Sequence, residues 1–150
     1  MYRFNEIDLG SRVWGHAYKF EWEESIDSEL EVFSLLDQIC AEHKLEQLGD
    51  SWNSITVEEA QGMISKGLRY DIAYNSPNYF EPGEVEAVES NLFKQIKWEH
   101  IRFAYTNCFG NPWTNSGGFS WNSLTQQTFD VGIVVAEKSR LFFIYFMSED

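Results

Sequence analysis

Seven consecutive apolar residues near the C-terminus, Leu141 to Met147, constrain the fold of this chain more than any other segment. The run is far shorter than the ~20 residues that a membrane-spanning helix needs. Because successive side chains of a strand point to opposite faces, a strand of this composition is apolar on both. The sequence therefore predicts a central strand that the chain covers on both faces, or covers on one face with a partner on the other.

Three other stretches are predicted to be strands, two of them with the two-residue period of an alternating strand. Residues 131–136 and the apolar run form the clearest hairpin, joined by four polar residues at 137–140. Residues 98–105 have this period. Residues 12–22 also alternate, and one face of that strand carries Trp14, His16, Tyr18, Phe20 and Trp22.

Two segments have the period of an amphipathic helix. In residues 25–45 an apolar stripe consists of Ile26, Leu30, Phe33, Leu36 and Cys40, and acids at the start of the segment favour a helix N-terminus. A second helix is predicted to begin near Pro82, because proline is favoured in the first turn. Its apolar face consists of Val85, Val88, Leu92 and Ile96.

A third, shorter helix is marked by its ends. Thr56 and Glu59 have the spacing of a capping box, in which each side chain bonds to the backbone of the other. We expect this helix to end near Lys66, with Gly67 in the left-handed conformation that closes many helices.

These elements predict one α+β domain spanning residues 1–150, a length typical of one domain. The order of one strand, three helices and three strands predicts a mostly antiparallel sheet of about four strands. About three helices are expected to pack on one face of that sheet.

The charge of the chain is strongly one-sided. Its net charge is -13, from 24 Asp and Glu against 11 Lys and Arg. The first fifty residues alone hold 12 acids and 4 bases. Such a surface repels nucleic acid and anionic membranes, and attracts a basic partner.

Six acids and no base lie between residues 21 and 31. A solvated helix face is the usual explanation of such a run, and solubility alone is a sufficient benefit. The global imbalance and the lack of nearby bases for i,i+4 pairs favour a binding role instead. The predicted electrostatic binding residues are Glu21, Glu23, Glu24, Asp27 and Glu31.

The sequence has no convincing catalytic or metal-binding motif. The three histidines lack the spacing of zinc ligands, and no nucleophile elbow, phosphate-binding loop or dinucleotide fingerprint occurs. Cys40 and Cys108 are most simply two buried free thiols in a reducing compartment. No basic region followed by an apolar run opens the chain, so we expect a cytoplasmic protein. Because the motifs above are lacking, we also expect that the protein is not an enzyme and uses no cofactor or metal.

Residues 107–127 form a long polar loop with large aromatic side chains. Aromatic residues dominate binding hot spots, so Trp113, Phe119 and Trp121 are candidate anchors for a partner. The alternative is that these rings only pin the loop to the body of the protein. A sugar-binding platform would use similar residues.

An acidic α+β domain of this size resembles the immunity proteins of bacterial polymorphic-toxin and contact-dependent growth inhibition systems. Residues 120–125 and 128–132, followed by an apolar hairpin that ends in acids, carry most of the resemblance, about a fifth of the chain. The resemblance implies that the chain binds and neutralises one cognate toxin domain, often a basic nuclease. The class shares no common motif, so no binding residue follows from it.

Three functions therefore remain as hypotheses. The first is an immunity protein that neutralises a basic, nuclease-type toxin domain without contacting nucleic acid or membrane, acting as a monomer or homodimer. The second is a nucleic-acid mimic that inhibits a DNA-binding enzyme. The third is a small carbohydrate-binding or small-molecule-binding domain, or a hydrolase, that uses the 107–127 loop.

Overall fold

The computed structural model describes residues 2–74, 76–110, 112–113 and 120–148. Its main element is a six-stranded sheet in which every neighbouring pair of strands is antiparallel. In spatial order the strands are β1 (Arg3–Ile7), β2 (Gly15–Glu21), β8 (Arg140–Ser148), β7 (Phe129–Ala136), β4 (Phe103–Thr106) and β3 (Asn53–Ser54).

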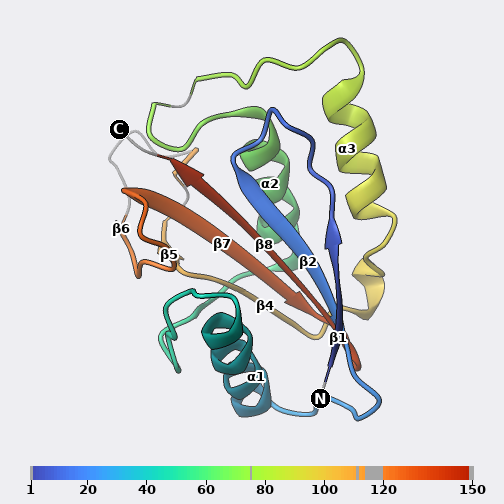
Figure 1. The fold of residues 1–150 in the computed structure, drawn as a ribbon. Helices are drawn as coiled ribbons and strands as arrows, with labels where there is room; N and C mark the ends of the chain where they lie inside the picture. The colour runs from blue at the N-terminus through green and yellow to red at the C-terminus, as the bar shows by residue number, and fades with distance from the viewer. Residues whose placement is uncertain (1, 75, 111, 114–119, 149–150) are drawn as a thin grey trace.

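The remaining elements surround this sheet (Figure 1). The helices are α1 (Glu29–Glu42), α2 (Val57–Arg69), α3 (Glu84–Phe93) and the 3-10 helix η1 (Trp98–His100). Two short strands, β5 (Cys108–Phe109) and β6 (Ser120–Trp121), pair with each other. The predicted α+β class, the antiparallel sheet and the three α-helices are confirmed, but the sheet has six strands where about four were expected.

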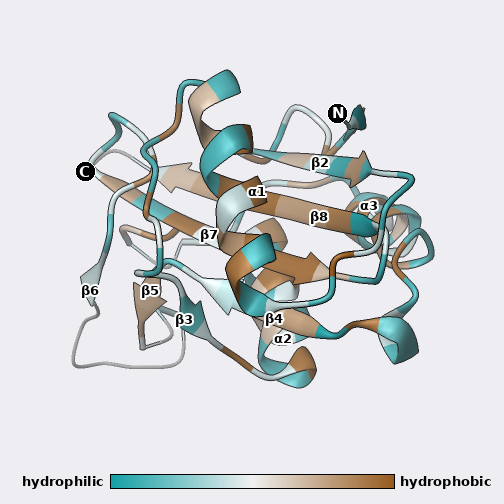
Figure 2. Ribbon diagram, turned by 90° about the horizontal axis from the view of Figure 1, so that it is seen from below, coloured by the Kyte–Doolittle hydropathy of each residue, from teal (hydrophilic) through white to brown (hydrophobic). Residues whose placement is uncertain are grey.

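The helices lie on both faces of the sheet, so their predicted placement on one face was wrong. In Figure 2, α1 lies in front of the strands, while α2 and α3 lie behind them. Each face has its own apolar cluster. Val32, Leu36 and Ile39 of α1 belong to one cluster, and Ile64 of α2 and Leu92 of α3 belong to the other.

The apolar run is the centre of this arrangement. Strand β8 pairs with β2 on one side and with β7 on the other. Its side chains alternate between the clusters, so that Phe142 and Ile144 face α2 and α3, whereas Leu141 and Phe143 face α1. Burial of each such side chain stabilises the fold by roughly 1.5–3 kcal/mol. The prediction of a central strand covered on both faces is confirmed, and the chain itself supplies both covers.

Helix α2 begins as predicted but ends later. The Thr56 hydroxyl accepts a hydrogen bond from the Glu59 N–H, and the Glu59 carboxylate accepts one from the Thr56 N–H, each 3.0 Å long. The helix then runs to Arg69, so the expected end near Lys66 was wrong. Gly67 is helical, and a Cβ added there would lie 2.3 Å from the Phe146 ring. This glycine therefore serves close packing of helix against sheet.

Candidate functional site

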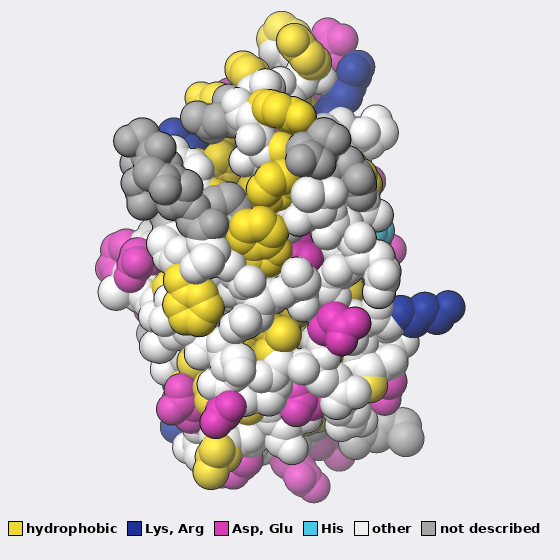
Figure 3. Space-filling model, turned by 90° about the vertical axis from the view of Figure 1, so that its left-hand side faces the viewer, with side chains coloured by type: hydrophobic (Ala, Val, Ile, Leu, Met, Phe, Trp, Pro, Cys, Tyr) yellow, Lys and Arg dark blue, Asp and Glu magenta, His cyan; other side chains and the backbone are white. Residues whose placement is uncertain are grey.

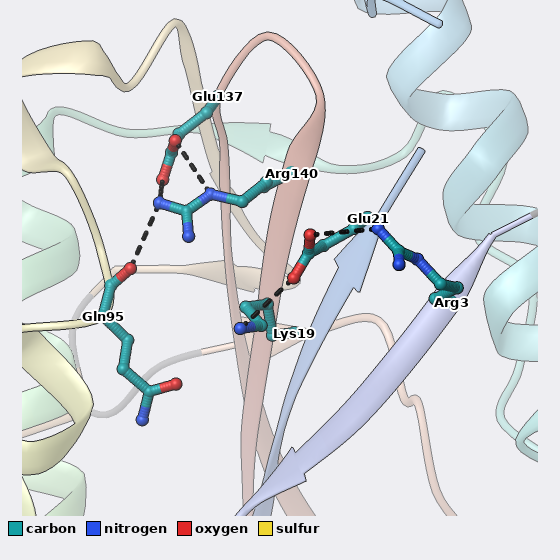
Figure 4. Close-up of polar contacts among 6 residues, drawn as sticks. All are labelled: Arg3, Lys19, Glu21, Gln95, Glu137 and Arg140. Atoms are coloured by element: carbon teal, nitrogen blue, oxygen red, sulfur yellow. Dashed lines mark hydrogen bonds and ion pairs between the residues drawn. The ribbon is translucent and has the colours of Figure 1, made fainter. Parts of the chain in front are cut away.

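The acids of residues 21–31 lie at the end of β2, in the loop that follows and at the start of α1. Three of the six, Glu21, Asp27 and Glu29, interact with residues from distant parts of the sequence. Glu21 forms ion pairs with Lys19 at 3.2 Å and with Arg3 at 3.7 Å (Figure 4). Glu21 is also in register with Arg140 of β8. Its negative charge is therefore largely compensated within the fold.

Arg140 is itself held by a neighbouring acid. Its guanidinium donates to the Glu137 carboxylate at 2.7 and 3.1 Å and to the Gln95 carbonyl at 3.2 Å (Figure 4). Lys97 N–H donates a further hydrogen bond to Glu137 at 3.3 Å. These contacts tie the β7–β8 turn to the segment after α3.

Three further acids organise the start of α1. The carboxylate of Asp27 lies 3.8 Å from the guanidinium of Arg102, and Glu31 accepts a hydrogen bond from the Asp27 N–H at 3.0 Å. Glu29, in the first turn of α1, interacts with Tyr105 of β4. Burial, together with the charge and hydrogen bond of Glu29, raises the pKa of Tyr105 above its usual range. These contacts give Asp27 and Glu31 structural roles that the sequence did not reveal.

Glu23 and Glu24 differ from the other acids of the run. Both side chains are exposed, and no described residue forms a hydrogen bond or ion pair with either. They follow Trp22 directly, at the point where the chain leaves β2 for α1. Of the five predicted electrostatic residues, these two retain the most uncompensated charge.

Two hollows meet at Trp22. The larger, of about 480 Å³, is lined by Tyr2, Arg3, Glu21, Trp22, Glu23 and Glu24. The smaller, of about 320 Å³, is lined by Trp22, Glu24, Ser25, Ile26, Glu31, Ser34, Leu35 and Gln38. Because they share Trp22 and Glu24, we treat them as one site and call it the Trp22 groove.

The Trp22 groove combines apolar surface with excess negative charge. Four carboxylates line it against one cation, Arg3, which already pairs with Glu21. The apolar part of the smaller hollow comes from Trp22, Ile26 and Leu35. The sequence placed Trp22 only on an aromatic strand face. The signal for a site was an aromatic residue between Glu21 and Glu23 at the end of a strand.

The two predicted aromatic anchors that the structure describes, Trp113 and Trp121, do not line the Trp22 groove. Trp113 is only 7 % exposed and packs edge-to-face on Phe146, with ring centroids 6.2 Å apart. Trp121 is half-buried against Phe129, at 5.3 Å. Phe119 lies outside the described residues. The burial of Trp113 leaves a partner little to contact and favours the alternative that this ring pins the loop.

Figure 3 views the molecule from the side on which β5 and β6 lie in Figure 1. Hydrophobic side chains reach the surface along the middle of this face. Acidic side chains are more frequent in its lower half, the end at which α1 lies in Figure 1. None of the described residues that line the Trp22 groove belongs to the 107–127 loop, although both the acids and the loop were predicted as parts of a binding site.

A buried polar network, which was not predicted from the sequence, fixes both ends of the 107–127 loop. The fully buried Asp130 carboxylate accepts hydrogen bonds from Leu124 N, Thr125 N, Thr125 Oγ1 and Asn107 Nδ2, at 2.8–3.1 Å. Asn107 Oδ1 accepts a further bond from Gly132 N at 2.7 Å. Several polar residues of this loop thus have a structural explanation.

Some of the described titratable groups have clear pKa shifts. Burial raises the pKa of both Cys40 and Cys108 to about 12, and both are free thiols as predicted. A hydrogen bond from Tyr2 is the main cause that holds the pKa of Glu42 below its usual range. A general acid needs a raised carboxyl pKa instead.

The described residues, 2–74, 76–110, 112–113 and 120–148, offer neither a metal cluster nor a membrane-spanning helix. No group of three or more His, Cys, Asp or Glu side chains in that part of the chain is placed to hold a metal ion. None of its helices is both long and apolar enough to cross a membrane.

Comparison with protein families, curated proteins and solved structures gives no match to this chain. The functional interpretation of the Trp22 groove therefore rests on its own geometry and charge.

Proposed function

We propose that this chain is a non-catalytic inhibitor of the immunity type, which binds and neutralises a basic, nuclease-type toxin domain through the Trp22 groove. The observation that carries the proposal is the pairing of an apolar floor with two exposed carboxylates, Glu23 and Glu24, that have no partner among the described residues. A basic protein surface complements both features of the groove. Its cationic groups can pair with the two carboxylates, and the aliphatic parts of its Lys and Arg side chains can pack on the apolar floor.

Electrostatic attraction would act before contact. A net charge of -13 on 150 residues creates a field that raises the rate of encounter with a basic partner. The same field disfavours nucleic acid as a direct ligand, because phosphates carry the wrong sign. Charge of this kind contributes more to association rate and partner choice than to affinity.

Affinity would come from the groove itself. Binding energy at protein interfaces concentrates in a few central residues, and tryptophan is the type most enriched among them. Trp22 lies where both hollows meet, with the acids around it. It therefore replaces Trp113 as the aromatic residue that we expect to anchor a partner.

The proposal is tested by co-expression with the gene immediately upstream. We expect one basic protein to co-purify in a fixed ratio, to be toxic when expressed alone and to be harmless with this chain. A Glu23→Gln/Glu24→Gln double variant should protect less well than the wild type. A Glu46→Gln/Glu99→Gln variant, which removes two exposed acids elsewhere, serves as the matched control.

Two results would overturn the proposal. Capture of several unrelated DNA-binding proteins would favour a nucleic-acid mimic. A stable, folded protein that neutralises no neighbouring gene product and binds no basic protein would remove the inhibitory function altogether.

A further inference from the structure

Resting on the proposed function, we infer that the smaller hollow of the Trp22 groove is a receptor for one arginine side chain of the partner. The hollow lies between the loop after β2 and the first turns of α1, and its lining contains both apolar and acidic groups. Among the described residues that line it, Glu24 and Glu31 carry charge and none is Lys or Arg.

The hollow is preformed, because both of its walls are fixed. Backbone hydrogen bonds from Trp22 N to Ser139 O, at 3.0 Å, and from Ile26 N to Lys138 O, at 2.6 Å, tie the loop to the β7–β8 turn. The opposite wall is the start of α1, where Ser28 caps the helix by accepting from the Glu31 N–H at 3.2 Å. A preformed site avoids the entropy cost of ordering its walls when a ligand binds.

The chemistry of the lining fits a guanidinium on an aliphatic stem. The three methylenes of arginine can lie on Ile26 and Leu35, and the planar guanidinium stacks well on an indole such as that of Trp22. Its five N–H donors suit carboxylate acceptors, which Glu24 and Glu31 supply at the edge of the hollow.

Other cations fit this lining less well. The ammonium of lysine is compact, strongly hydrated and a poorer match for a flat aromatic face. Calcium requires six to eight oxygen ligands, whereas three of the eight lining residues here, Trp22, Ile26 and Leu35, offer no oxygen side chain. One oxygen of Glu31 already accepts from the Asp27 N–H, so fewer acceptors remain for an ion.

The inference is tested by NMR titration of the 15N-labelled protein with three short glycine-spaced peptides, which contain arginine, lysine or citrulline at the same positions. We expect the arginine peptide to shift the indole N–H resonance of Trp22, assigned through a Trp22→Phe variant. The indole resonance of the core residue Trp52 should not move. The lysine peptide should bind several-fold more weakly, and the uncharged citrulline peptide should give no shift.

Two variants make the test specific to the hollow. Glu24→Gln should raise the dissociation constant of the arginine peptide about three- to tenfold, since it removes a charged acceptor. Glu99→Gln changes the net charge equally at a distant exposed site and should leave the constant within about twofold. Equal shifts with arginine and citrulline, or equal effects of the two variants, would overturn the inference.

The result also separates this inference from the proposed function. If a basic partner co-purifies and its binding depends on Glu23 and Glu24, but the arginine peptide leaves Trp22 unchanged, the inhibitory function stands and the arginine receptor does not. If the peptide binds as expected but no partner exists, the receptor stands and the inhibitory function fails.

Discussion

Arg69 of α2 and Glu89 of α3 form a two-pronged ion pair, with guanidinium-to-carboxylate distances of 2.6 and 3.3 Å. Their side chains are 28 % and 24 % exposed, so water screens the pair only in part. Burial alone would raise the pKa of Glu89. The hydrogen bonds from Arg69 and Ser65 and the charge of Arg69 outweigh burial, so that pKa lies below its ordinary value of 4.5.

The direction of this shift predicts a dependence of stability on pH. Because the pKa of Glu89 is lower in the folded protein, its contribution is complete above about pH 4.5 and is lost as pH falls through the folded value. Glu89→Gln should therefore lower the free energy of unfolding by about 1 kcal/mol at pH 7 and by less at pH 3. Urea unfolding at both pH values measures it. An equal loss at both would contradict the prediction.

Gly67 and Gly62 of α2 offer a matched pair of glycine-to-alanine variants. At Gly67 the new methyl group would lie 2.3–2.6 Å from Phe146, so Gly67→Ala should destabilise the protein by roughly 1–3 kcal/mol. At Gly62 nothing lies within 4 Å, so Gly62→Ala should stabilise it by about 0.5–1 kcal/mol through helix propensity. Thermal unfolding measures the stability of each variant against the wild type. Stability changes of the same sign at Gly67 and Gly62 would refute the prediction.

The sequence was informative where local pattern and tertiary packing agree. The capping box at Thr56 and Glu59 gave the start of α2, and the two-sided run 141–147 gave the central strand with both faces covered. It failed at β1, whose sequence RFNEI has mostly exposed side chains and no clear alternation, because the strand lies at the edge of the sheet. The sequence also did not predict that Gly67 lies inside α2, because its contact with Phe146 joins residues 79 positions apart in the chain.

The candidate site was predicted only in part, for a related reason. A charge run shows how many acids are present but not which distant cations meet them. Arg3, the first residue of β1, compensates Glu21, and Arg102, just before β4, compensates Asp27; only the fold brings these pairs together. Glu23 and Glu24 are exposed, and their binding role stays a prediction. The apolar floor of Leu35 and Ile26 depends on how α1 meets the loop, which a charge run does not show.

Asp130 should be the most sensitive carboxylate in the chain. It is fully buried, and its acceptor oxygens serve the backbone N–H groups of Leu124 and Thr125. Asp130→Asn replaces one of these acceptors with a donor, so a buried N–H loses its partner and stability should fall by roughly 2–3 kcal/mol. The exposed Asp50→Asn should change stability by less than about 0.5 kcal/mol. Comparable losses in denaturant unfolding would contradict the buried role.

The two cysteines should be unreactive while the protein is folded. Both are 0 % exposed, and burial raises their pKa values to about 12, so almost no thiolate exists at pH 8. A disulfide reagent that reports free thiols should therefore react slowly with native protein and release two equivalents promptly in denaturant. Rapid reaction of one thiol under native conditions would show that its segment opens readily.

Salt dependence should distinguish Glu23 and Glu24 from the acids that are paired within the fold. Removal of both by Glu23→Gln/Glu24→Gln should slow association with the co-purified basic partner about three- to tenfold at low ionic strength. The difference in association rate between this variant and the wild type should shrink toward 1 M salt, where the Debye length falls to about 3 Å. Glu21→Gln should have a smaller effect, since Arg3 and Lys19 already compensate that carboxylate. Stopped-flow association rates at two salt concentrations measure both effects. A larger effect of Glu21→Gln would contradict the expectation that Glu23 and Glu24, rather than the paired Glu21, dominate the attraction.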